Sequence, residues 1–247
     1  MTLLIVRRFL YILCSLVFLQ QQAQASIVTI DAAENIYGAG SSILPGGGLS
    51  PTKIDLIPNV SYLTFGAYGR ITINGGGNRN NPDGIGARPA SSSNIGYDSI
   101  SGIYAPGAGY LVGLFVGPNG PLGPKPAALN FTPGAIGTSF LSLAPTLDQT
   151  FFIGDGFSQG QQQTFFVPNG ATELYLGISD AENYNGQPGS YRDNSGSYTV
   201  IYNEKASSVP EPTSLLLLIV SFFVIKKLSG KKKQPFPQSE LHSFLLP

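Results

Sequence analysis

Short alternating segments fill the middle of the chain and decide what it can fold into. Apolar and polar residues alternate over residues 27–31, 60–65 and 70–74, the period of a strand with one buried face. Further segments rich in β-branched and aromatic residues occupy residues 110–116, 164–167, 173–178 and 197–202. Pro-Gly and Pro-Asn-Gly turn signals lie at residues 118–120, 133–134 and 168–170.

Nothing in this central region has the period of a helix. The chain contains 31 Gly and 19 Pro but only 11% charged residues, a composition that suits an all-β extracellular module. Many short strands separated by turns are typical of a sandwich or jelly roll. We therefore predict an all-β fold, a jelly-roll-like β-sandwich, over residues 26–205.

The residue types missing from this region exclude several kinds of chemistry. The one Cys is Cys14 and the one His is His242, both near the ends of the chain, and Trp is absent. Without them, Ser-His-Asp and Cys-His catalysis, His/Cys zinc sites and disulfides are excluded. Residues 26–208 carry seven basic and twelve acidic side chains, a net charge of −5, which argues against a nucleic-acid partner.

The N-terminal segment has the pattern of a secretion signal. Arg7 and Arg8 precede the apolar residues 9–19, and Ala23-Gln24-Ala25 is a small-x-small cleavage site. Residues 1–25 are therefore predicted to be a signal helix that signal peptidase removes between Ala25 and Ser26. The alternative is an uncleaved membrane anchor.

The C-terminal segment combines a motif, an apolar run and a basic cluster. Pro210, Glu211 and Pro212 precede the apolar residues 215–225, and five lysines follow by residue 233. The apolar run is shorter than the about 20 residues of a stable membrane span, and the lysines fit a cytoplasmic end. The combination over residues 206–233 resembles a PEP-CTERM sorting signal with a short transmembrane helix.

That resemblance implies export and processing. Pro210, Glu211 and Pro212 would be recognised by a membrane exosortase, so the chain would be held in the inner membrane for a time and then reach the cell surface or the medium. Residues 234–247 form a polar tail, although such signals normally end soon after the basic cluster. The alternative is a plain single-pass anchor.

Oxygen-bearing side chains gather late in the predicted sandwich. Asp180, Asp193 and Asn194 lie among Pro and Gly residues that expose backbone carbonyls, just before a predicted strand. Ca²⁺ takes six to eight oxygen ligands of these kinds. The alternative is that Asp, Asn, Ser and Gly serve here only as turn formers.

The same region resembles the Ca²⁺-dependent galactophilic lectin family of PA-I type. The matching motifs are Ile-Ser-Asp at 178–180, Pro-Gly-Ser-Tyr at 188–191, Asp-Asn-Ser-Gly-Ser at 193–197, Gly-Ala-Tyr-Gly at 66–69, Asn-Pro-Asp at 81–83 and the segment 96–102. The resemblance implies a jelly-roll lectin domain and a Ca²⁺ cofactor. Its implied ligands are the side chains of Asp180, Asp193 and Asn194 and the carbonyls of Tyr68 and Ser190.

The resemblance also implies a sugar site beside the metal. A galactose-type glycan or exopolysaccharide would contact Asn81, Asp83, Asp180 and Asp193. The family's sugar-contacting His is Asn81 here, its Gln is Gly84, and residues 181–187 are an insertion. The metal shell therefore transfers to this chain better than the sugar specificity does.

Three functions follow from these patterns. The first is a non-enzymatic, Ca²⁺-binding, carbohydrate-binding-like surface protein. The second is a structural matrix or adhesion protein that keeps the fold and the Ca²⁺ site but binds no sugar. The third is a glycosidase that uses two acids such as Asp83 and Asp180, and nothing in the sequence places these two as a pair.

Overall fold

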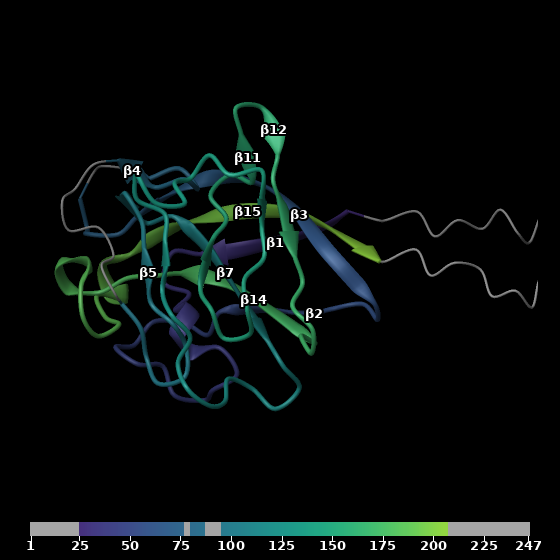
Figure 1. Cartoon of the computed structure of the whole chain (residues 1–247). Helices are drawn as coiled ribbons and strands as arrows, with labels where there is room; N and C mark the ends of the chain where they lie inside the picture. The colour runs from purple at the N-terminus through teal and green to yellow at the C-terminus, as the bar shows by residue number, and fades with distance from the viewer. Residues whose placement is uncertain (1–24, 77–79, 87–94, 207–247) are drawn as a thin grey trace, which may run out of the picture. The chain divides into compact units, whose positions relative to one another are not determined.

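The computed structural model describes residues 25–76, 80–86 and 95–206, which form strands, turns and short 3-10 helices (Figure 1). The chain divides into two compact units, Met1–Ser207 and Ser208–Pro247, and every described residue belongs to the first. No helix among the described residues is long and apolar enough to cross a membrane. The predicted signal helix and transmembrane helix lie outside the described residues.

The larger sheet has five strands. Their order is β1 (Ser26–Asp31), β15 (Ser195–Ala206), β3 (Val60–Thr72), β13 (Thr164–Phe166) and β9 (Ser142–Leu143). β15 pairs with both β1 and β3 in antiparallel fashion, and Ser26 lies opposite Tyr202. β1 therefore begins, and β15 ends, toward the same end of the sheet, at the right in Figure 1.

The second sheet has four strands in the order β10 (Phe151–Phe152), β7 (Leu111–Val116), β14 (Glu173–Ile178) and β2 (Thr52–Asp55). All six residues of β7 are buried. Both faces of this strand are therefore covered, which explains its continuous apolar sequence.

Short pairs and single turns complete the described structure. The pairs are β4 (Ile85–Gly86) with β6 (Gly107–Ala108), β5 (Ile103–Tyr104) with β8 (Leu129–Asn130), and β11 (Phe157–Ser158) with β12 (Gln161–Gln162). The 3-10 helices are η1 (Ile36–Gly38), η2 (Glu182–Tyr184) and η3 (Tyr191–Asp193).

A chain of aromatic contacts joins the two sheets. Phe65 of β3 meets Phe165 of β13 with ring centroids 5.2 Å apart, and Phe165 meets Phe151 of β10 at 5.6 Å. Phe151 then stacks on Phe115 of β7 at 5.1 Å. All four rings are fully buried, so the inner faces of the sheets enclose one core. The prediction of an all-β fold is confirmed, and the jelly-roll order of the strands stays a prediction.

Most predicted strands appear where the pattern placed them. The boundaries predicted for β14 match, and β1, β7, β13 and β15 lie over their predicted segments. The strands predicted at residues 60–65 and 70–74 are wrong in one respect, because they are a single strand, β3. The glycine between them at position 69 marks a close approach and no break, because a Cβ there would lie 2.5 Å from the carbonyl oxygen of Ser197 on β15 and φ is 119°.

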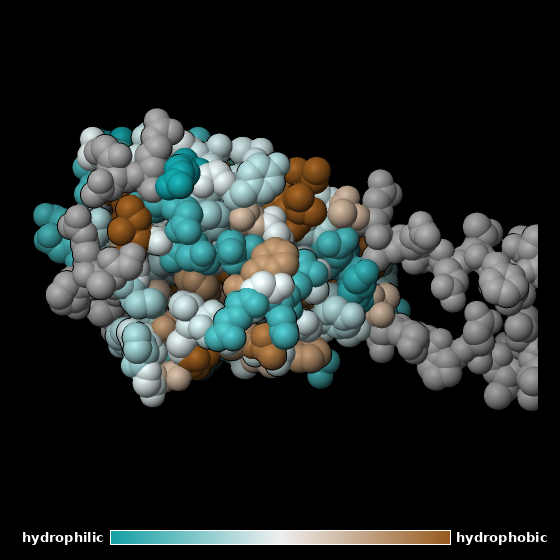
Figure 2. Space-filling model, turned by 90° about the horizontal axis from the view of Figure 1, so that it is seen from above, coloured by the Kyte–Doolittle hydropathy of each residue, from teal (hydrophilic) through white to brown (hydrophobic). Residues whose placement is uncertain are grey.

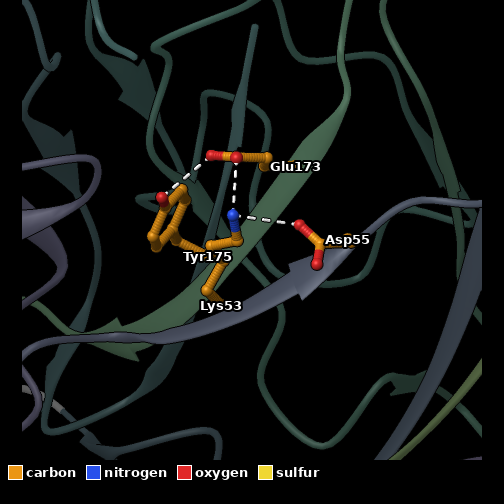
Figure 3. A network of polar contacts seen from close by, with 4 residues as sticks. All are labelled: Lys53, Asp55, Glu173 and Tyr175. Atoms are coloured by element: carbon orange, nitrogen blue, oxygen red, sulfur yellow. Dashed lines mark hydrogen bonds and ion pairs between the residues drawn. The ribbon is translucent and has the colours of Figure 1, made fainter. Parts of the chain in front are cut away.

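Charged residues lie along the β2 edge of the four-stranded sheet (Figure 3). Nζ of Lys53 on β2 lies 2.7 Å from Oε1 of Glu173 on β14 and 3.0 Å from Oδ1 of Asp55. The hydroxyl of Tyr175 donates to the other oxygen of Glu173 at 2.9 Å. Burial and the neighbouring Glu173 raise the pKa of Tyr175 to about 12. The network links β2, one of the strands that the sequence analysis did not predict, to β14.

Candidate functional site

Asp180 is a buried carboxylate at the end of β14. Its side chain is fully buried, and Oδ1 accepts a hydrogen bond from the N–H of Ala181 at 2.8 Å. Oδ2 accepts from Nδ2 of Asn194 at 3.0 Å. Both donors are neutral, so these contacts leave the negative charge of Asp180 uncompensated.

The protonation of Asp180 reflects this environment. Burial raises the pKa of the Asp180 carboxyl to about 7, the hydrogen bonds from Asn194 and Ala181 oppose the rise, and the charge of Asp193 adds to it. A cation beside the carboxylate would reverse the effect, because an opposite charge favours the ionised form.

Asn194 supplies a second oxygen without a partner. Its Nδ2 group donates to the carbonyl of Ala32 and to Asp180, each at 3.0 Å, and these two bonds fix the orientation of the amide. Oδ1 therefore points away from both of these acceptors, and it is buried with no hydrogen-bond donor. A buried acceptor left unpaired costs free energy, which a metal ion or a bound water would recover.

The loop between these two residues is folded tightly over the end of β14. Gly189 donates its N–H to the carbonyl of Asp180 at 3.1 Å. The hydroxyl of Tyr191 accepts from the N–H of Asp180 at 3.1 Å and donates to the carbonyl of Ile178 at 3.2 Å. Because Tyr191 is buried, it holds the backbone on both sides of Asp180 in place.

Ser190 and Asp193 border this pair. Ser190 has a left-handed backbone with φ at 64° and is exposed, and Asp193 is exposed at the end of η3. The carbonyl of Asp193 accepts from the N–H of Gly75 at 3.2 Å. Gly75 follows β3, so the end of that strand reaches this loop, a neighbour that the sequence analysis did not identify.

Tyr68 lies elsewhere on the sheet. It stands opposite Thr199, whereas the site begins where Ser195 stands opposite Thr72. Four residues of strand separate the two pairs, about 13 Å at the usual rise. The structure therefore brings together Asp180, Asn194 and their neighbours, and it does not bring Tyr68 to them.

The carbonyl of Tyr68 also has a role within the sheet. The preceding residue, Ala67, donates its N–H to the carbonyl of Asp155 at 2.9 Å, away from β15. Because hydrogen-bonded and non-bonded pairs alternate in an antiparallel ladder, Tyr68 turns its carbonyl toward Thr199. This geometry gives no support to a ligand role for Tyr68, which stays a prediction.

Asn81 and Asp83 belong to a second cluster. Oδ1 of Asp83 accepts from the N–H of Asp155 at 2.8 Å, and Nδ2 of Asn81 lies 3.5 Å from the other oxygen of Asp83. Burial raises the pKa of Asp83, the hydrogen bond from the backbone N–H of Asp155 opposes the rise, and the charge of Asp155 adds a smaller rise. Asp155 lies between two glycines, in the turn that follows β10. The hydroxyl of Tyr198 lies 2.7 Å from the carbonyl of Asn81 and anchors this loop.

The remaining predicted residues fall at the ends of the chain. Ala25 is exposed, and Ser26 is the first residue of β1. Pro210, Glu211 and Pro212 lie outside the described residues. Across residues 25–76, 80–86 and 95–206, no three His, Cys, Asp or Glu side chains come together as a metal site would require. A metal here would therefore depend on amide and backbone oxygens as well as carboxylates.

Comparison with known proteins adds a distant structural likeness. No protein-family model matches the chain, and no curated protein matches it in sequence. Three solved chains match it in structure, one of them a lectin domain. That chain is called "EclA N-terminal domain; PllA-like lectin", with 14% identity and a TM-score of 0.30, and the match covers 72% of this chain and 95% of the other.

Proposed function

We propose that the chain is an exported, non-catalytic, carbohydrate-binding-like surface protein with a Ca²⁺ centre at Asp180 and Asn194. One observation carries the metal site: a fully buried carboxylate without a positive partner is hydrogen-bonded to an amide whose own oxygen is buried and unpaired. A hard divalent cation beside Asp180 would neutralise the carboxylate, and turning the Asn194 amide over would direct its oxygen, in place of Nδ2, toward the same ion.

The residues present fit Ca²⁺ better than a transition metal. The described part of the chain offers no His or Cys, and the oxygens nearby are the Asp180 carboxylate, Oδ1 of Asn194, and the exposed groups of Asp193 and Ser190. Ca²⁺ accepts carboxylate, amide and carbonyl oxygens in flexible geometry. When bound, the ion would supply positive charge and open positions for ligand hydroxyls. The chain's own residues hold the loop rigid through Tyr191.

A Ca²⁺ titration tests the metal site. Calorimetry and thermal unfolding of the purified full-length chain should show binding and a higher melting temperature with Ca²⁺ than with EDTA. Asp180→Asn should abolish both effects. Asp98→Asn is a matched control, because Asp98 is exposed in a turn whose backbone Asn tolerates equally well. Absence of heat and of any melting shift in the unmodified chain would exclude the site.

A glycan array with and without EDTA tests sugar binding separately. Ca²⁺-dependent binding to galactose-type glycans, lost in Asp180→Asn, would support the carbohydrate-binding function. Ca²⁺ stabilisation with a silent array would favour the alternative, a structural or adhesion protein of the cell surface. The cluster of Asn81, Asp83 and Asp155 supports that alternative. Both carboxylate oxygens of Asp83 already accept hydrogen bonds, from Asp155 and Asn81, so fewer acceptors remain for a sugar.

A further inference from the structure

The outer face of the five-stranded sheet presents an exposed row of aromatic rings. Side chains alternate across a strand, so the buried Leu63 and Phe65 place Tyr62, Gly66 and Tyr68 on the opposite face of β3. Tyr68 is 59% exposed. The sandwich core covers the inner face alone, and the rings on the outer face have to be explained by something else.

Two more rings extend this row from neighbouring segments. Phe166 of β13 is 45% exposed and meets Tyr62 edge-on, with ring centroids 6.3 Å apart. Phe157 is 43% exposed, and its ring lies 3.6 Å from where a Cβ on Gly66 would be. Positions 62 to 68 of one strand span about 20 Å, so the rings form an elongated platform.

Hydroxyl groups lie beside the rings on the same face. Thr64 and Tyr68 of β3 lie on the outer face, and Thr199, which pairs with Tyr68, lies there too. Thr29 of β1 pairs in turn with Thr199. Ile201, which pairs with Gly66, and Ile27, which is 65% exposed, also lie on this face. The face therefore combines apolar side chains with neutral hydrogen-bonding groups, which suits a sugar chain, whose rings offer C–H faces and hydroxyl edges.

Charge on this face is confined to its ends. Asp31 and Arg70 flank Ser197 toward one end, and Lys205, opposite Tyr62, lies at the other. Between them the paired outer-face positions of β1, β15 and β3 carry no charged side chain. A neutral platform matches an uncharged ligand and offers a phosphate backbone or an acidic chain nothing to pair with.

The distribution of apolar residues disfavours a second copy as the occupant. β11, which carries Phe157, lies at the top of Figure 1, so Figure 2 looks onto this side of the molecule. Hydrophobic residues in that view stand in separate groups among hydrophilic ones. Stable homodimer interfaces are more continuously apolar.

We propose that this ring platform, defined by Tyr62, Tyr68, Phe157 and Phe166, binds an uncharged polysaccharide chain by stacking and requires no metal. It is a second site, separate from the Asp180 loop. The rings are held before binding, because Tyr62 and Phe166 contact each other and the N–H of Phe157 is fixed by Oδ1 of Asp155 at 2.8 Å. Preorganised rings lose little conformational entropy when a sugar stacks on them.

Affinity electrophoresis of the purified full-length chain tests the platform. Gels would contain hydroxyethylcellulose, galactomannan or amylose, with acidic polygalacturonate as the comparison, all in EDTA. We expect retardation by at least one uncharged polymer, weaker by about tenfold in Tyr68→Ala and in Phe166→Ala. Leu122→Ala should keep wild-type retardation, because Leu122 is 64% exposed in a loop that follows β7 of the other sheet.

Four outcomes would overturn the platform, and each leaves the Ca²⁺ proposal testable on its own. The first is no retardation in any uncharged gel. The second is retardation that appears only in parallel gels with Ca²⁺ in place of EDTA, needs Asp180 and persists in the ring variants. The third is retardation by polygalacturonate alone. The fourth is a dimer in sedimentation velocity that Phe166→Ala dissociates, which would make this face a contact between copies of the chain.

Discussion

The Asp180 carboxyl should make the stability of the metal-free protein depend on pH. Its folded pKa of about 7 lies above the ordinary Asp value of 3.8, so the folded state holds the proton more tightly than the unfolded state does. Stability is therefore greatest below the unfolded pKa and falls as the pH rises toward 7, by up to about 4 kcal/mol. Urea unfolding in EDTA at pH 5 and pH 8 measures the loss.

Two comparisons identify the residue responsible. Asp180→Asn should reduce the pH dependence, whereas Asp98→Asn should keep it. Ca²⁺ at pH 8 should restore stability in the unmodified chain, because the ion replaces the proton that the buried carboxylate has lost. An unchanged pH dependence in Asp180→Asn would show that it comes from other carboxyls whose pKa is raised, such as Asp83 and Asp148.

The candidate site was predictable from sequence only where its ligands are local. Asp180 and Asn194 lie at the two ends of one loop, so a motif could find both. The positions of Tyr68, Gly75 and Asp155 relative to the site depend on which residues of neighbouring strands pair with each other. The ladder of β3 with β15 moves Tyr68 away from the site and brings Gly75 to it, and no local pattern specifies that register.

Adjacent phenylalanines on β13 offer a matched test at the scale of the element. Phe165→Ala should destabilise the fold by about 3–5 kcal/mol, because the lost ring leaves a cavity where both sheets meet. Phe166→Ala should change stability by less than about 1 kcal/mol, because that ring is exposed. Chemical denaturation measures both. Equal losses would contradict the assignment of inner and outer faces.

Strands were predictable where their sequence is apolar throughout or alternates between apolar and polar residues. The sequences of β14 and β7 are almost continuously apolar, and in β1 apolar and polar residues alternate. β2 was missed because its four residues include only one buried apolar side chain, Ile54, between Lys53 and Asp55. Its place at an edge follows from pairing with β14, which depends on tertiary structure.

At the scale of the whole molecule, the charged edge of β2 should keep copies of the chain apart. Edge strands that lack charge pair readily with other edges. Lys53→Ile should lower the melting temperature only slightly, since the Lys53 side chain is 44% exposed and surface ion pairs contribute little, but should increase self-association at high concentration. Light scattering after size exclusion measures it. Lys125→Ile, an exposed loop substitution, is the control, and equal association in both variants would contradict a role for the edge.

The predicted processing points lie just outside the described sheet. Ser26, predicted as the first residue after cleavage, is the first residue of β1, and β15 ends at Ala206, before Pro210. We therefore expect a chain of residues 26–206 to melt at the temperature of the full chain. A chain starting at Thr29 should melt lower, because it loses the pairs of Ile27 and Val28 with β15.

Mass spectrometry of the protein exported by its host tests the same boundaries in place. A mature N-terminus at Ser26 and a C-terminus near Pro210 would support removal of both ends by signal peptidase and an exosortase. An N-terminus inside β1 would contradict the prediction, because cleavage there would remove the outer strand that covers one edge of β15. Retention of residues 211–247 would support the alternative of a permanent anchor, and the pairing of β1 with β15 would be unaffected in either case.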